Sequence, residues 1–159
     1  MRITVLAVGR IKEKFFTGAV EEYSKRLGRY CKLEVIEVAD ESTPDHASEK
    51  EREKILQKEG QRLLKYMRDD AYMIALAIHA KQMSSESFAD MIGELGLAGK
   101  SHIIFVIGGS LGLSQEVLSR ADRQLSFSEM TFPHQLMRVV LLEQIYRAYR
   151  ILQGEPYHK

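Results

Sequence analysis

The sequence is poor in cysteine and has no tryptophan, because Cys31 is the only thiol among 159 residues. A single cysteine cannot form a disulfide within one chain, and it excludes a metal site built from several cysteines. The chain also has no apolar run long enough to cross a bilayer, and no signal-peptide pattern precedes its first strand-like segment. From these absences we expect a cytoplasmic protein that has no membrane partner and holds no metal.

An excess of charge of one sign is missing as well. The 23 basic and 22 acidic residues give a formal net charge of +1, which is not typical of a domain that coats nucleic acid. The basic residues are nevertheless concentrated at the ends: residues 1–32 carry eight Lys or Arg and three acids, and residues 131–159 carry four and two. Two interpretations remain open, a local RNA-binding surface and an uneven solvated surface.

Segments typical of strands and of helices alternate along the chain. Apolar runs predict strands at residues 3–8, 33–38, 72–78, 102–107 and 124–128, and helical spacing predicts helices at 13–27, 45–67, 84–95, 114–121 and 133–152. This order predicts an α/β fold in which helices flank a mainly parallel sheet. Because no linker or repeat interrupts it, we expect residues 1–159 to form one domain. The charged run 49–59 is expected to be a solvated helix face.

The last predicted helix, residues 133–152, is apolar nearly all round. Arg138 and Arg147 fall on opposite sides of it, so they leave no broad polar face. A helix of this kind must be buried on more than one side, and in a small domain a second copy of the chain could cover one of them. We therefore expect a twofold homodimer, with burial wholly inside one subunit as the alternative.

Ligands of open α/β sheets bind beyond the carboxyl ends of the strands, and two such ends are preceded by long apolar runs. The first lies around Leu76, where a plain buried strand is the alternative. The second is the glycine-rich run 107–114, whose glycines let a ligand approach the backbone and whose following helix would add N–H donors. This run lacks the Lys-Ser/Thr ending of a P-loop and the GxGxxG spacing of a dinucleotide fold, and a simple turn is its alternative.

A third candidate is the loop 125–134, which joins the last strand to the last helix. Pro133 suits the first turn of that helix, because its missing N–H costs nothing there. The loop carries Phe127 and Phe132 and has free backbone donors and acceptors, so it could bind an adenine. A purely structural connection is equally compatible with the pattern.

The end of the chain differs from an ordinary frayed terminus, which carries small polar residues. Its last four positions are Pro156, Tyr157, His158 and Lys159. Tyrosine can stack on a base, lysine can bind a phosphate, and histidine titrates in the range useful for a general base. An unordered tail and the remnant of an expression tag are the alternatives, and a single histidine argues against a tag.

Several motifs together resemble the RlmH family of SPOUT methyltransferases. They include the segments 131–134, 138–139, 146–148 and 156–158, with the start 3–14 and the run 105–109 also similar. The resemblance covers essentially the whole chain. It implies a deep trefoil knot near the C-terminus, a homodimer, and methylation by S-adenosylmethionine of N3 of a pseudouridine. That nucleotide lies in the helix 69 loop of 23S ribosomal RNA, in the large subunit or assembled ribosome.

The resemblance also implies roles for individual residues. The cofactor pocket would use Leu76, Gly108, Phe127, Ser128, Glu129, Met130, Thr131 and Phe132, and substrate handling would use Arg147, Tyr157, His158 and Lys159. Two positions depart from the family pattern: Ala80 stands where glycine is more common, and Lys159 stands where some relatives have arginine. Lysine keeps the charge of arginine but loses its bidentate fork.

A mechanism follows as a hypothesis, since the accepting ring nitrogen must lose a proton before or during attack on the methyl group. His158 or a water that it holds would remove the proton, and Tyr157 would hold this base. Arg147 and Lys159 would contact the RNA backbone or stabilise negative charge, with the tail acting across the dimer. The alternatives are a non-catalytic ribosome-binding module of the same fold and a nucleotide-binding protein that uses the glycine-rich run for phosphate.

Overall fold

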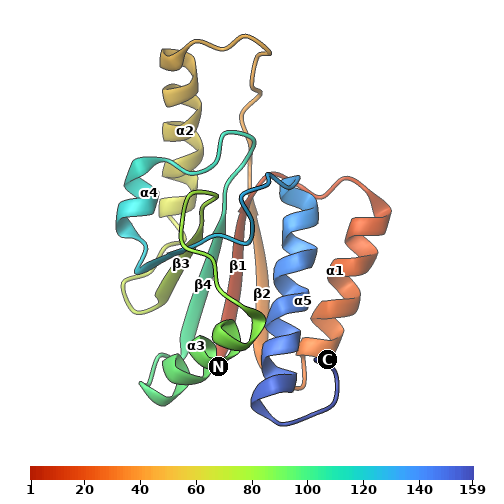
Figure 1. The fold of residues 1–159 in the computed structure, drawn as a ribbon. Coiled ribbons are helices and arrows are strands. Elements are labelled where there is room, and N and C mark those ends of the chain that lie inside the picture. The colour runs from red at the N-terminus through yellow and green to blue at the C-terminus, as the bar shows by residue number, and fades with distance from the viewer.

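A sheet of five parallel strands forms the centre of the computed structural model, which describes residues 1–159 (Figure 1). Its strands lie in the order β2 (Lys32–Val38), β1 (Arg2–Val8), β4 (His102–Ile107), β3 (Tyr72–Leu76) and β5 (Arg123–Leu125). The register of the two central pairs brings Val5 opposite both Val35 and Phe105. The predicted α/β fold is confirmed, and the sheet is parallel throughout.

Helices cover both faces of this sheet. On one face lie α1 (Lys14–Leu27), α3 (Ser85–Leu97) and α5 (His134–Leu152), and on the other lie α2 (Glu49–Leu64) and α4 (Gln115–Arg120) (Figure 1). Alternate residues of β1 enter the two cores: Val5 packs with the α3 and α5 side, and Leu6 with the α2 and α4 side. Strands buried on both faces must be apolar throughout, which is why the central strands were easy to predict.

Several predicted elements are longer than the observed ones. The helix expected at 45–67 begins at Glu49, because the Ser48 hydroxyl accepts a hydrogen bond from the Glu51 N–H and caps it there. The strands expected at 72–78 and 124–128 end at Leu76 and Leu125. The residues that follow them are loops, and these loops form the walls of the cavity described below.

The prediction that the charged run 49–59 is a solvated face is wrong at Glu59, whose exposed fraction is 3%. Glu59 lies one helical turn from the buried Ile55 and Leu63, so it shares the stripe of α2 that faces the sheet. Its Oε2 accepts a hydrogen bond from the Glu41 N–H at 2.9 Å, and its Oε1 has no partner. Burial is the main reason why the pKa of Glu59 is raised.

The long helix α5 is covered largely by its own chain, since it packs on α1, α3 and the sheet. Arg138 is fully buried under the end of β1, whereas Arg147, on the other side of the helix, is part-exposed. Leu136, Val139 and Val140 keep part of their surface exposed near the start of α5. The expected homodimer therefore stays a prediction, with these apolar side chains available to it.

No helix has both the length and the apolar character needed to span a membrane.

Candidate cofactor pocket and C-terminal tail

An open cavity of about 130 Å³ lies at the carboxyl ends of β3, β4 and β5. Three loops and the start of α5 supply its walls: residues 76–78, 107–109 with Gly112, 125–128 with 130–132, and His134 with Met137. The structure thus brings together the three strand ends that the sequence analysis selected separately.

Hydrogen bonds fix two of these walls to each other. The Ala77 N–H donates to the Leu125 carbonyl at 2.9 Å, and the Ser126 N–H donates to the Lys81 carbonyl at 3.1 Å. The Ser126 hydroxyl, itself buried, lies 3.0 Å from the Ile78 carbonyl oxygen. The loop after β3 and the loop after β5 therefore form one rigid unit, and a ligand that enters the cavity meets a preformed wall.

The glycine-rich run owes its composition mainly to a tight turn. A Cβ on Gly108 would overlap the backbone carbonyl of Gly112, and Gly112 itself has a φ of +84°. The N–H donors expected from the following helix do not reach the cavity. Its cap residue, Ser114, is buried instead beside Gly60 of α2, and its hydroxyl accepts from the Val117 N–H.

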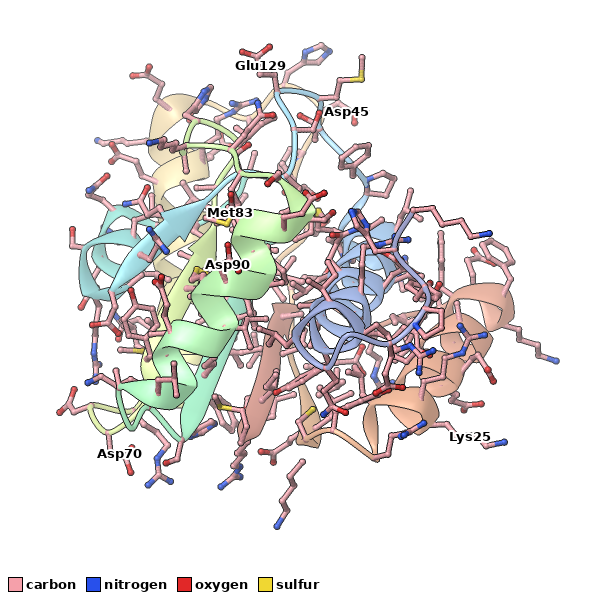
Figure 2. All side chains as sticks on the ribbon, turned by 60° about the horizontal axis from the view of Figure 1, so that its bottom comes forward. Lys25, Asp45, Asp70, Met83, Asp90 and Glu129 are labelled. Atoms are coloured by element: carbon pink, nitrogen blue, oxygen red, sulfur yellow. The ribbon has the colours of Figure 1, made fainter.

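Seven of the eight residues predicted to bind the cofactor line this cavity, namely Leu76, Gly108, Phe127, Ser128, Met130, Thr131 and Phe132. Glu129 does not, and it borders a separate shallow cavity beside His79 and Ala80. Figure 2 shows Glu129 at the outer tip of its loop, directed away from α3 and α5.

Two further residues, His134 and Met137, line the cavity from the first turn of α5. His134 belongs to the candidate loop 125–134, but neither residue was assigned to the cofactor from the sequence. The His134 ring packs against Gly9, and its Nδ1 is buried without a hydrogen-bond partner. Burial, followed by the nearby Arg138 guanidinium, lowers the pKa of His134, so a neutral ring is favoured. The sequence does carry a signal for His134, because this residue directly follows Pro133 at the predicted start of the helix.

A second cavity, of about 260 Å³, adjoins the first one. It shares Leu125, Phe127 and Phe132 with the first cavity and continues toward the start of α3, where Figure 2 labels Met83. The Ser85 hydroxyl donates to Gln144 Oε1 at 2.7 Å on its far side. These two cavities together form a groove that leads from the strand ends toward the side of α5 that carries the tail.

The C-terminal tail folds back along α5, and its side chains are held by charged partners (Figure 1). The Arg147 guanidinium donates to Glu143 Oε1 at 2.7 Å, and the Tyr157 hydroxyl donates to the same oxygen at 3.1 Å. Arg147 also lies over the Tyr157 ring, 4.7 Å from its centroid. Burial and the Glu143 carboxylate raise the pKa of Tyr157 to about 12, so this hydroxyl stays protonated.

His158 connects the tail to α3. Its Nδ1 lies 3.1 Å from Arg147 Nη1, and its Nε2 lies 2.7 Å from Glu86 Oε1. Lys159, by contrast, is exposed and forms no ion pair. The structure thus brings Arg147, Tyr157 and His158 together, but none of these residues lines the cavity at the strand ends of the same chain.

The turn that precedes the tail is fixed by Arg150. This side chain forms an ion pair with Glu155 and donates to the Pro156 carbonyl at 2.7 Å. The Tyr30 hydroxyl, in the turn after α1, donates to Glu155 as well, at 3.0 Å. The tail is therefore ordered by specific contacts, in contrast to the alternative of an unordered terminus.

A parallel sheet with a preformed cavity at its strand ends defines the class of α/β proteins that bind a small ligand at that edge. A family described as predicted SPOUT methyltransferase matches residues 1–158, and the chain belongs to this family. Its curated relatives include proteins named ribosomal RNA large subunit methyltransferase H. Those from Clostridium kluyveri, Bifidobacterium adolescentis and Clostridium novyi are 60%, 63% and 62% identical to this chain, each over the full length of both proteins.

Among solved structures, a probable methylase family protein from Haemophilus influenzae has a similar fold. The superposition gives a TM-score of 0.53 at 14% identity and covers 96% of this chain and 66% of the other. At this identity the likeness concerns the fold alone.

Proposed function

We propose that this protein transfers the methyl group of S-adenosylmethionine to N3 of a pseudouridine in the helix 69 loop of 23S ribosomal RNA. The substrate would be the large subunit or the assembled ribosome, and the reaction would take place in the cytoplasm. The names of full-length relatives at about 60% identity support the reaction class. The observation that carries the proposal is the cavity that joins three separate strand ends, together with an ordered tail of Arg147, Tyr157 and His158.

The cavity suits S-adenosylmethionine, which combines a flat adenine with a polar ribose and amino-acid part. Nine of its sixteen lining residues are hydrophobic, including Phe127 and Phe132, and can pack against an adenine. Ser128, Thr131 and the free backbone groups of the loops offer hydrogen bonds to the polar part. When bound, this cofactor supplies a methyl group on a positively charged sulfur.

The protein contributes position and a base, because the N3 proton must leave the ring. His158 is this base, and Glu86 orients its ring through the bond to Nε2. Tyr157 stays protonated and fixes the tail through Glu143. Arg147 and Lys159 bind the RNA backbone, or they stabilise the negative charge that develops on the pseudouridine as its proton leaves.

The tail acts on the partner's pocket in a homodimer. The tail residues do not line the pocket of their own chain. A second copy of the chain is therefore the simplest source of the tail that completes each pocket. Apolar side chains that α5 and the preceding loop leave partly exposed, including Phe132, Leu136 and Val140, are the surface on which the copies meet. The trefoil knot expected from the family resemblance would build both the pocket and this interface.

The test is transfer of a labelled methyl group from S-adenosylmethionine to ribosomes that lack the modification, with the modified nucleotide mapped. We expect one labelled pseudouridine in 23S RNA, and competition by S-adenosylhomocysteine but not by ATP. Label on a different nucleotide would overturn the substrate assignment. Calorimetry that shows no binding of S-adenosylmethionine, with or without ribosomes, would favour the non-catalytic ribosome-binding module instead.

A further inference from the structure

The loop between β1 and α1, residues 9–13, is held by its backbone in one conformation. The Ile11 N–H donates to Glu37 Oε2 at 2.9 Å, and the Lys12 N–H donates to Gln135 Oε1 at 3.0 Å. These two acceptors come from different elements, the second strand of the sheet and the first turn of α5. The loop is thereby fixed beside the start of α5, as Figure 1 shows.

Arg138 supports the same loop from inside the protein. Its guanidinium, with 1% of the side chain exposed, donates to the Gly9 carbonyl at 2.6 Å and to the Val8 carbonyl at 3.2 Å. It also forms an ion pair with Glu37, the residue that accepts from the loop backbone. Arg138 is thus a buried cation with three partners at the ends of β1 and β2, and one of them is the carbonyl of Gly9, the first residue of the loop. The loop therefore has a built support.

The side chains that this loop presents are cationic and aromatic. Arg10, Lys12 and Lys14 are exposed, and none of them forms an ion pair. Phe15 is 67% exposed, which is unusual for a ring of its size at the surface. The only acid in the segment is the exposed Glu13, so residues 10–15 carry three positive charges against one negative.

This surface lies at the same edge of the sheet as the cofactor pocket. A Cβ on Gly9 would come within 3.0 Å of the His134 ring, and that ring lines the pocket. Lys12 also contributes to the lowered pKa of His134, while Asp40 opposes that shift.

We propose that Arg10, Lys12, Lys14 and Phe15 form a docking surface for unpaired RNA that flanks the methylated nucleotide. The inference rests on the proposed function for the identity of its partner. Lysine and arginine side chains without ion pairs bind phosphates without giving up an internal contact. An exposed ring can stack on an unpaired base, which is how proteins recognise RNA loops. Because the backbone is already fixed, binding orders only the side chains.

The experiment compares Arg10→Ala/Lys12→Ala/Lys14→Ala with Lys50→Ala/Arg52→Ala/Lys54→Ala. The control removes three exposed cations from α2, on the opposite face of the sheet. We expect the first variant to raise the KM for ribosomes about 10- to 100-fold and to reduce the salt dependence of binding by about 2 in its logarithmic slope. Its kcat and its affinity for S-adenosylhomocysteine should match those of the control.

Phe15→Ala tests the stacking contribution separately, and we expect a loss of ribosome affinity of about tenfold without a change in the salt slope. Equal KM values for the loop variant and the α2 control would overturn the proposal. A loop variant that no longer sediments as a dimer would also overturn the proposal, since the surface would then belong to the subunit interface. Co-sedimentation with ribosomes is measured in parallel. If the wild type binds ribosomes through this loop but transfers no methyl group, the docking surface stands and the proposed reaction fails.

Discussion

Arg147 Nη1 lies 3.1 Å from Nδ1 of His158, and this pair determines where the imidazole carries its proton. A guanidinium only donates, so Nδ1 must accept and the proton of a neutral ring resides on Nε2. Nε2 in turn donates to Glu86 Oε1 at 2.7 Å. Both ring nitrogens are therefore engaged in the free protein. His158 can take a proton only after Arg147 turns away from it, for example toward an RNA phosphate.

If His158 is the base, His158→Ala lowers the rate of methyl transfer about 100- to 10,000-fold, the range of general base catalysis. Its affinity for S-adenosylhomocysteine should stay within about twofold of the wild type, because His158 lines no part of the pocket of its own chain and is assigned to the RNA base at the partner's pocket. Single-turnover transfer to ribosomes measures the first quantity and calorimetry the second. A chain that ends at Pro156 serves as the second variant. Wild-type rates in both would remove the tail from the mechanism.

Action of the tail across a dimer can be tested by mixing two inactive variants. Gly108→Ala obstructs the turn at the pocket, and His158→Ala removes the base, so each alone should be inactive. In a random mixture half of the dimers are mixed, and each holds one intact pocket facing one intact tail, which restores about a quarter of the wild-type activity. Tails that act within their own chain would restore none. Size-exclusion chromatography of each variant verifies that it still forms dimers.

Local patterns predict the order of strands and helices in this fold well, because each element carries its own apolar pattern. The strand at 102–107 is correct to the residue, since both of its faces are buried and its pattern is continuous. The loop at Gly108 could be selected for the same reason, because it directly follows this strand. Its meeting with the loop at Phe127 in one cavity depends on the order of the strands within the sheet, which the sequence pattern does not contain.

The features that the sequence concealed all depend on contacts between distant segments. Arg138 looks like a surface cation on an apolar helix, but its partners Val8 and Gly9 lie about 130 positions earlier in the chain. Glu59 belongs to a charged run, so the sequence does not reveal that Glu59 lies on the buried face of α2. No local pattern indicates either case, because burial of a charge is decided by what packs over it.

Arg138→Met should be strongly destabilising, since it removes the cation that pairs with Glu37 and the donor to the carbonyl groups of Val8 and Gly9. Breaking a buried ion pair costs about 3–5 kcal/mol, and we expect about 3 here because Glu37 keeps contact with water. Urea unfolding measures this loss directly. Arg26→Met, which removes an exposed cation paired with Glu22 on α1, is the matched control and should unfold like the wild type. Equal midpoints for the two variants would contradict the supporting role of Arg138.

Glu59→Gln should change the pH dependence of stability. Burial, and to a smaller extent Asp40, raise the pKa of Glu59, although the Glu41 N–H and Arg62 oppose this shift. The folded protein therefore binds a proton more tightly than the unfolded chain. Its free energy of unfolding falls as pH rises from the ordinary glutamate pKa, about 4.3, through the raised value. Glutamine cannot ionise and escapes this loss, while its side-chain oxygen can still accept from Glu41.

The stability of Glu59→Gln relative to the wild type should accordingly be more favourable at pH 8 than at pH 4.5. Urea unfolding at both pH values provides the comparison. Glu53→Gln on the same helix is the control, because this side chain is exposed and its environment changes little on folding. A difference between Glu59→Gln and the wild type that is the same at both pH values would show that the Glu59 carboxyl is ionised in the folded protein as readily as in water. The unpartnered Oε1 beside Gly109 would then need a donor or a cation, which the residues around it do not supply.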